Sequence, residues 1–212
     1  NLTLDLTIEE NWHGGTLARE AFNATIINCH NKSDLTSRAD YVGGLVSKLS
    51  DGSKMIACSN TGSIISENQN VEKVGGLVGN LSANSTIEGC FSKGKIAVLN
   101  DSATAKVGGL VGYIETNENS KPHMIGCWNN MTIDFQKKYE NIAWGTENVD
   151  YAYCEYIISI DLEFDNEIIT SLNNGLTSIG SICRFNEQGI PIIGTSSSGT
   201  ANGSNFGDGG EF

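Results

Sequence analysis

The residue types that carry acid–base and metal chemistry do not recur at fixed positions in this sequence. The three histidines, His13, His30 and His123, fall at unrelated places, so a metal site or a catalytic triad cannot be assembled from them. Carboxylates are plentiful, but Glu88 stands where the aligned segments carry isoleucine. A polysaccharide lyase needs a basic side chain beside carboxylates that hold calcium, and the arginines do not repeat either. The sequence therefore predicts no catalytic residue, no cofactor and no metal site, and indicates that the chain is not an enzyme.

Cysteine is the reactive residue that does recur. Cys29, Cys58 and Cys90 each lie 15 residues after the first glycine of a pair, and Cys127 lies 19 residues after another. Stacked repeats would place these thiols above one another, in rungs about 4.8 Å apart. Parallel Cα–Cβ bonds would hold the β-carbons farther apart than in a disulfide. The spacing therefore predicts a ladder of buried, reduced cysteines.

The other two cysteines lie outside this series. Cys154 and Cys183 could either form a disulfide with each other or remain as two free thiols. The sequence contains no CxxC pair and no regular spacing of Cys and His, which argues against metal binding.

The residue directly after each recurring cysteine is a candidate for binding. This row consists of His30, Ser59, Phe91 and Trp128. If the cysteines point inward, the row points outward, and its rings could stack on sugar rings or on an apolar patch of a protein. The alternative is that the rings lie beneath a corner loop as a small satellite core. His30, Phe91 and Trp128 are the predicted binding residues.

The elements that would position these residues are sequence repeats. The five-residue motif Val-Gly-Gly-Leu-Val recurs at intervals of 32 and 33 residues, as Val42–Val46, Val74–Val78 and Val107–Val111. A weaker copy spans Gly14–Ala18 and a degenerate one spans Ile142–Gly145. Periods of about 20 to 50 residues indicate stacked units, none of which can bury its apolar face alone.

Each repeat offers three short apolar stretches separated by turns, and none shows helical periodicity. We therefore predict an all-β fold, a right-handed parallel β-helix (β-solenoid) with three sides and about five rungs. The glycine pairs would form its tight corners, and residues 115–121 would bulge from one of them. The cysteine and the apolar residue three places before it would point to opposite faces of a regular strand. Both can point into the core only if the chain bends between them. The alternative is an antiparallel sandwich with hairpins at the glycines, which would need no strict period.

The phrase Val-Gly-Gly-Leu-Val-Gly, followed by Ile-x-x-Cys and a Gly-x-Ile turn, resembles the GLUG-motif repeat of bacterial secreted and surface proteins. The resemblance covers roughly residues 14–145, with Thr16 where leucine is expected and Ala143 and Trp144 where a glycine is expected. It implies a β-helical module outside the cell, found in adhesin-like proteins and as an accessory region of some large proteases. The family supplies no catalytic residue.

The period is lost in the C-terminal part of the chain. A short helix is predicted there, with Asp165 as its N-cap and Gly175 as the glycine that ends it. A hairpin is predicted within Ile182–Ile193. Because an open solenoid end exposes core and unpaired backbone, this segment is predicted to cap the last rung. The predicted domains are a GLUG-type repeat domain over 1–154, a C-terminal capping segment over 155–193 and a Gly/Ser-rich tail over 194–212.

Charge limits the partners. With 13 basic and 25 acidic residues the formal charge is −12, and no cluster of Lys and Arg occurs, so nucleic acid is not a predicted partner. No apolar run reaches the length of about 18 residues that a membrane span needs, so no membrane insertion by this segment is predicted. We predict a secreted or cell-surface, non-enzymatic module, adhesin-like or structural, that contacts a host or cell-surface protein or glycan. The alternatives are a carbohydrate-active or carbohydrate-binding domain and an accessory region of a larger secreted protease.

Overall fold

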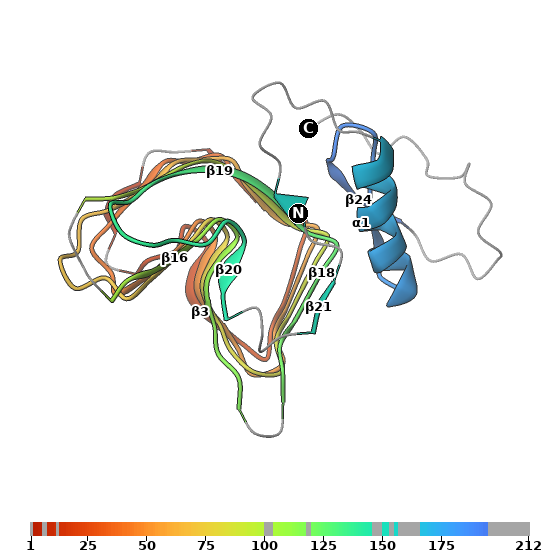
Figure 1. The fold of residues 1–212 in the computed structure, drawn as a ribbon, viewed down its shortest axis with the longest axis horizontal. Helices are drawn as coiled ribbons and strands as arrows, with labels where there is room; N and C mark the ends of the chain where they lie inside the picture. The colour runs from red at the N-terminus through yellow and green to blue at the C-terminus, as the bar shows by residue number, and fades with distance from the viewer. Residues whose placement is uncertain are drawn as a thin grey trace.

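The chain winds into a parallel β-solenoid, followed by a short helix and a β-hairpin (Figure 1). The computed structural model describes residues 2–5, 8–11, 13–99, 104–117, 120–145, 150–152, 155–156 and 166–194. The coil makes about four turns, against the five rungs expected, and the all-β parallel β-helix is confirmed. The predicted tail beyond residue 194 lies outside the described residues, as do Cys154 and Asp165.

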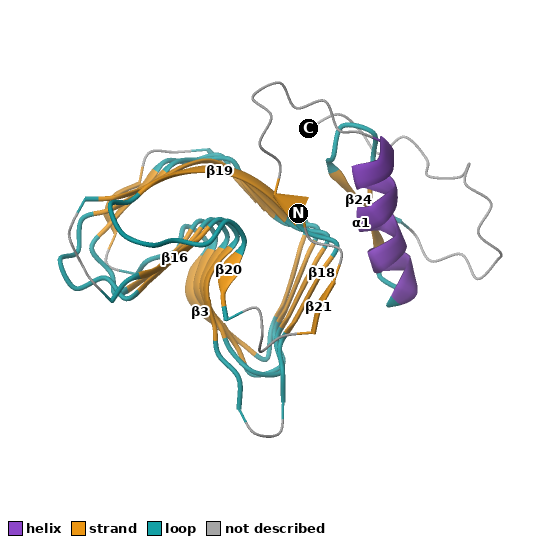
Figure 2. Ribbon diagram, viewed as in Figure 1, coloured by secondary structure: helices purple, strands orange, loops and turns teal. Residues whose placement is uncertain are grey.

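Four stacks of parallel strands form the coil (Figure 2). Sheet I contains β7 (Tyr41–Gly43), β12 (Lys73–Gly75) and β16 (Lys106–Gly108). Sheet II contains β3 (Ala18–Phe22), β8 (Val46–Ser50), β13 (Val78–Leu81), β17 (Val111–Ile114) and β20 (Ala143–Trp144). Sheet III contains β4 (Thr25–Ile27), β9 (Lys54–Ile56), β14 (Thr86–Glu88), β18 (His123–Ile125) and β21 (Asp150–Ala152).

Sheet IV is the longest side of each turn. It contains β1 (Leu2–Leu4), β2 (Ile8–Asn11), β5 (Cys29–Asn31), β6 (Leu35–Ser37), β10 (Ser59–Asn60), β11 (Ile64–Ser66), β15 (Phe91–Val98), β19 (Trp128–Asp134) and β22 (Glu155–Tyr156). In the third turn the segment after the cysteine runs as one strand, β15, whereas in the second turn it is split into β10 and β11.

The Val-Gly-Gly-Leu-Val motif contributes to two strands of each turn and not to one. Strand β12 ends at Gly75 and β13 begins at Val78, with a bend between them. Each turn therefore has four sheets, which corrects the predicted three sides. The strands pair in the register of the sequence repeat, so that Val74 lies between Val42 and Val107.

Two apolar cores fill the coil, one in each lobe of its cross-section (Figure 1). The larger core lies between sheets II and III and contains Leu77, Ile87 and Cys90 from the third turn. The smaller core lies between sheets I and IV and contains Val74 and Ile96. The glycine pairs lie at the waist between the two lobes.

At this waist Gly44, Gly76 and Gly109, the second glycines of the three strong copies, face a buried polar row of sheet IV. The row consists of the residues two places after the recurring cysteines, Asn31, Asn60, Ser92 and Asn129. The Ser92 Oγ donates a hydrogen bond to the carbonyl of Gly109 at 2.6 Å. A Cβ on Gly76 would lie 2.7 Å from that Oγ and 2.1 Å from the Gly109 oxygen. Glycine is required here because the facing backbones leave no room for a side chain.

The sequence predicts a bend between each recurring cysteine and the apolar residue three places before it. The structure places this bend at the residue directly before the cysteine. Asn28, Ala57, Gly89 and Gly126 hold this position, and their φ angles are 53°, 53°, 56° and 58°. This left-handed conformation turns the chain between sheets III and IV. As a result, Ile87 and Cys90 both point into the larger core.

The predicted thiol ladder is confirmed. Its members, Cys29, Cys58, Cys90 and Cys127, are free cysteines, fully buried except for the half-buried Cys29. The backbone N–H of Cys58 donates to the Sγ of Cys90 at 3.3 Å. That thiol in turn donates to the carbonyl of Glu88 at 3.3 Å. Cys29, Cys58 and Cys90 are thus tied to one another through sulfur as well as through the backbone ladder.

Buried thiols predict a loss of stability in alkali. Burial raises the pKa of Cys90 and raises that of Cys183 to about 12, whereas a thiol in the unfolded chain ionises near pH 9.0. Above that pH the unfolded chain releases protons that the folded protein keeps. The free energy of unfolding should therefore fall by about 1.4 kcal/mol per pH unit for each of these two thiols. Below pH 9 this contribution to stability is fully present.

Urea unfolding of the wild type and of Cys90→Ala at about pH 8 and about pH 10 measures this effect, since the variant removes one thiol and leaves all other titrating groups in place. The difference in unfolding free energy between the two proteins should shrink by about 1.4 kcal/mol per unit above pH 9. Equal pH dependence of the two proteins would contradict a buried, neutral Cys90.

The C-terminal segment is formed by helix α1 (Asn166–Ser178) and an antiparallel hairpin of β23 (Cys183–Phe185) and β24 (Pro191–Ile193), as predicted. The helix does not end at Gly175, which is buried within it. It ends at Ser178, and Gly180, with a φ of 65°, is the left-handed residue that stops it. The N–H groups of Gly180 and Ser181 donate to the carbonyls of Thr177 and Leu176 at 3.0 and 2.9 Å, which is a Schellman motif.

This segment packs against the side of the coil, beside β18, and not over the last rung (Figure 1). Leu172 and Leu176 of α1 form a third apolar core with Phe91 and Trp128, which come from two successive turns. The small residues of the bend allow this approach, because a Cβ on Gly126 would lie 2.6 Å from the Cγ of Leu176. The predicted end cap is therefore corrected to a lateral cover that spans several turns.

Candidate functional site

Two of the predicted binding residues lie beneath the C-terminal segment. The rings of Phe91 and Trp128 stack with centroids 4.4 Å apart and an interplanar angle of 6°. They are only 8% and 2% exposed, and the Trp128 Nε1 donates to the carbonyl of Gly189 at 2.9 Å. The structure thus brings the two rings together, but in the satellite core that was the alternative, and they present no open surface to a ligand.

The third predicted residue, His30, belongs to the same row but does not join these rings. Ser59 lies between His30 and Phe91 in the row. The Nδ1 of His30 lies 2.8 Å from the Ser59 Oγ, and its Nε2 lies 2.8 Å from the Asn28 Oδ1. Burial lowers the pKa of His30. The three predicted residues therefore do not form one shared site.

On the outer surface, two pockets lined by residues of sheets I and II lie where these sheets meet, and together they form a groove. Its floor consists of Ser47, Gly79 and Gly112, small residues that let the two sheets approach, since a Cβ on Gly112 would lie 2.7 Å from the backbone nitrogen of Val74. Its first wall, from sheet I, consists of Tyr41, Lys73 and Lys106. Its second wall, from sheet II, consists of Lys48, Tyr113 and Trp144, and the buried Asn80 lies in the same row. We call it the I–II groove.

Lysines and aromatic rings alternate along the I–II groove. The Nζ of Lys73 lies 4.5 Å from the ring centroid of Tyr41 and 5.1 Å from that of Tyr113. The Nζ of Lys106 lies 4.3 Å from the ring of Trp144. An ammonium group over a ring face is attracted by the ring quadrupole. These contacts join successive turns, so charge and aromatic surface form one continuous strip.

The centre of the groove has shifted ionisation equilibria. Burial lowers the pKa of Lys73, although Glu115 and Glu72 act in the opposite direction. A hydrogen bond from Asn80 lowers the pKa of Glu115 and so keeps its carboxylate ionised. Burial, followed by the charge of Glu72, raises the pKa of Tyr41. At neutral pH the groove therefore presents a half-buried ammonium group, ionised Glu115 and a neutral phenol.

Asn80 holds Glu115 in place. Its Nδ2 donates to the Glu115 Oε2 at 2.9 Å and to the Ser82 Oγ at 3.0 Å. Its side chain is fully buried, and its Oδ1 has no hydrogen-bond partner among the described residues. An unpaired buried acceptor costs free energy. The orientation of Asn80 is therefore set by the carboxylate of Glu115 and not by its own complete pairing.

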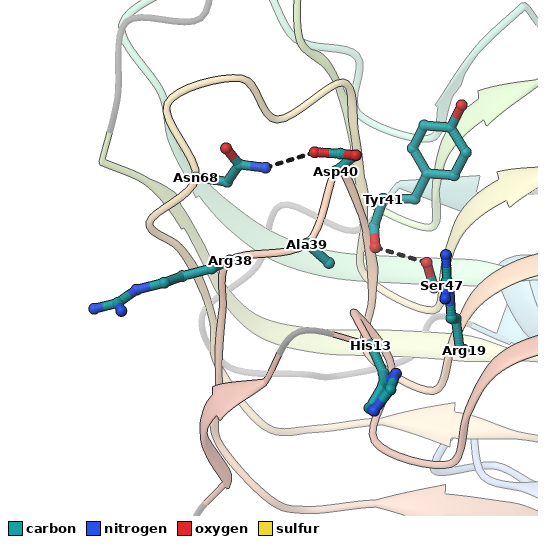
Figure 3. A pocket seen from close by; sticks show the side chains of 8 residues that line it. All are labelled: His13, Arg19, Arg38, Ala39, Asp40, Tyr41, Ser47 and Asn68. Atoms are coloured by element: carbon teal, nitrogen blue, oxygen red, sulfur yellow. Dashed lines mark hydrogen bonds between the residues drawn. The ribbon is translucent and has the colours of Figure 1, made fainter.

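Two hollows lie along the groove. The first, of about 480 Å³, lies at its N-terminal end and is lined by Arg19, Tyr41 and Ser47 together with His13, Arg38, Ala39, Asp40 and Asn68 (Figure 3). Arg19 lies beside Ser47 in Figure 3, whereas Arg38 points away from the other labelled residues. The second hollow, of about 320 Å³, is lined by Glu72, Lys73, Thr104, Lys106 and Tyr113.

In the described part of the chain, no group of three or more His, Cys, Asp and Glu side chains is placed to hold a metal ion. Helix α1, with 13 residues, is too short for a membrane span of about 20 residues, and no other helix occurs in those ranges. The I–II groove itself offers charge, hydrogen bonding and ring faces, which are the means of recognising a polar ligand.

Sequence reasoning missed this groove, although a signal is present. The residue directly before each Val-Gly-Gly is Tyr41, Lys73 or Lys106, so it is aromatic or basic in every strong copy. The residue five places after the first glycine is Lys48, Asn80 or Tyr113. The two positions become one site only because the chain reverses between them.

The third turn of the coil matches a known motif. The family model described as the GLUG motif matches residues 72–97, which include Lys73 and Asn80 of the groove. No curated protein and no solved structure matches the chain. The other turns repeat the matched segment in register, as the pairing of β12 with β7 and β16 shows.

Proposed function

We propose that this GLUG-motif repeat protein is a non-enzymatic extracellular β-helical module, adhesin-like or structural, secreted or held at the cell surface. In this proposal it contacts a host or cell-surface protein or glycan through the I–II groove. The observation that carries the proposal is the strip of half-exposed Tyr41, Tyr113 and Trp144 that alternates with lysines. Tyrosine and tryptophan are enriched among binding anchors because they offer large contact areas at a small entropy cost.

The carboxylates of the groove fit binding better than hydrolysis. A glycosidase needs a carboxylic acid whose pKa is raised so that it can donate a proton to the leaving group. Glu115 has the opposite environment, because Asn80 and Ser82 donate to its Oε2 and its pKa is lowered. Of the two carbohydrate-related alternatives, this supports a carbohydrate-binding domain over a carbohydrate-active enzyme.

Loss of the rings should abolish contact while leaving the coil intact. In a glycan array and a cell-attachment assay, Tyr113→Ala combined with Trp144→Ala should weaken binding at least about tenfold. Phe22→Ala is the matched control, because Phe22 is an aromatic residue of sheet II, 66% exposed, and lies outside the groove. Circular dichroism should show the same β-rich spectrum for all three proteins. Undiminished attachment by the double variant would exclude the groove as the contact surface.

A further inference from the structure

We infer that the ligand of the I–II groove is a linear acidic polysaccharide. Its carboxylate or sulfate groups pair with Lys73 and Lys106, and its sugar rings lie along Tyr41, Tyr113 and Trp144. The inference rests on the proposed function, since it names the ligand class of the same groove.

Charge pairing within the groove leaves two ammonium groups available. Three of the neighbouring cations are already paired, Lys48 with Glu20 at 3.4 Å, Arg38 with Glu67 at 3.1 Å and Lys138 with Glu140 at 3.0 Å, and Arg19 lines the first hollow at the other end of the groove. In the described ranges, neither Lys73 nor Lys106 has a carboxylate oxygen within 4.0 Å of its Nζ. Because the chain as a whole carries a formal charge of −12, most of its surface repels anions. These two lysines make the groove a place where an anionic chain can lie.

The environment of Lys73 favours an added anion. Its side chain is half-buried between the rings of Tyr41 and Tyr113. Burial outweighs the nearby carboxylates of Glu72 and Glu115, because the net effect lowers the pKa of Lys73. The ammonium group is therefore short of compensating negative charge. An anionic group bound beside it would supply that charge in a region shielded from water, where charge-assisted hydrogen bonds are strong.

The geometry of the groove fits a repeating polymer better than a folded protein surface. Lys73 and Lys106 pair in register on adjacent strands, about 4.8 Å apart. Tyr113 and Trp144 pair in the same way on the opposite wall. Beside its second hollow the groove thus presents Lys73 and Lys106 on one wall and Tyr113 and Trp144 on the other. A linear polysaccharide offers rings and charges in the same alternating manner, whereas a protein surface seldom does.

Matched polymers test the inference. The affinity of the full chain is measured for polygalacturonate, for its methyl-esterified neutral form and for poly-L-glutamate, at low and high salt. We expect binding to polygalacturonate that weakens as salt rises and little binding to the ester. Lys73→Met with Lys106→Met should lower the affinity for polygalacturonate at least about tenfold. Lys54→Met is the control, since Lys54 is exposed on sheet III; it should leave the affinity unchanged.

The outcomes separate this inference from the proposed function. Equal binding of the ester, or no binding of polygalacturonate, overturns the inference that the ligand is acidic. In that case the ring variants can still show that the groove is a contact surface. Tighter binding of poly-L-glutamate assigns the groove to an acidic protein segment and also overturns it. If the double variant does not fold, Lys106→Met alone carries the comparison. Intact attachment by the ring variants would instead remove the proposed function itself.

Discussion

Replacing Gly76 with alanine is expected to destabilise the folded protein by about 3 kcal/mol or more. The added Cβ would lie 2.1 Å from the oxygen of Gly109 and 2.7 Å from the Oγ of Ser92. Both neighbours belong to the stacked backbone or to the buried polar row at the waist, so neither can move without disturbing adjacent turns. Urea unfolding followed by circular dichroism measures the loss as a lower midpoint at an unchanged slope.

Gly52→Ala is the matched control for this substitution. Gly52 has a φ of 78°, and a Cβ there would have only the Asn23 Oδ1 as a near neighbour, at 3.9 Å. Its replacement therefore costs the left-handed backbone strain alone, about 1–2 kcal/mol. If the two variants lost equal stability, the waist would have room for a side chain, and the two-lobed cross-section would be wrong.

The repeat itself was predictable, because the period and the thiol ladder both follow from equal spacing along the chain. Stacking residues at equal spacing puts Cys58 beside Cys90 whatever the shape of each turn. The shape was not predictable in the same way. The waist depends on the contact of Gly76 with Ser92, which lie on opposite sides of the turn. No local pattern reports such a contact, so the sequence alone predicts that the glycine pair forms a corner of a three-sided coil.

The candidate site was missed for a related reason. Lys73 and Tyr113 face each other across the I–II groove only because the chain reverses between sheets I and II. The sequence places Phe91 and Trp128 in one row, but their exposure depends on where a segment much later in the chain, α1 and the hairpin, docks. The repeat interval in the sequence determines which residues stack in one row, whereas tertiary packing determines whether those residues are buried.

Leu172→Asp is expected to release the C-terminal segment from the coil without unfolding the coil. Leu172 is fully buried against the side of the coil, and an unpaired carboxylate there costs about 3–5 kcal/mol. In the described part of the chain, the two cores inside the coil contain no residue of α1 or of the hairpin. The cover can therefore leave while the stacked turns keep their own apolar contacts.

Release of the segment should uncover the stacked rings of Phe91 and Trp128. Tryptophan emission should shift to longer wavelength as Trp128 loses its bond to Gly189, the segment should become sensitive to protease, and the far-ultraviolet β-signal should persist. Association that rises with concentration is also expected, because an exposed apolar patch is an interaction surface. Ile179→Asp, at a position 41% exposed just after α1, should do none of this. Cooperative loss of the whole β-signal in Leu172→Asp would instead show that the lateral cover is part of the fold of the coil and not a separable layer.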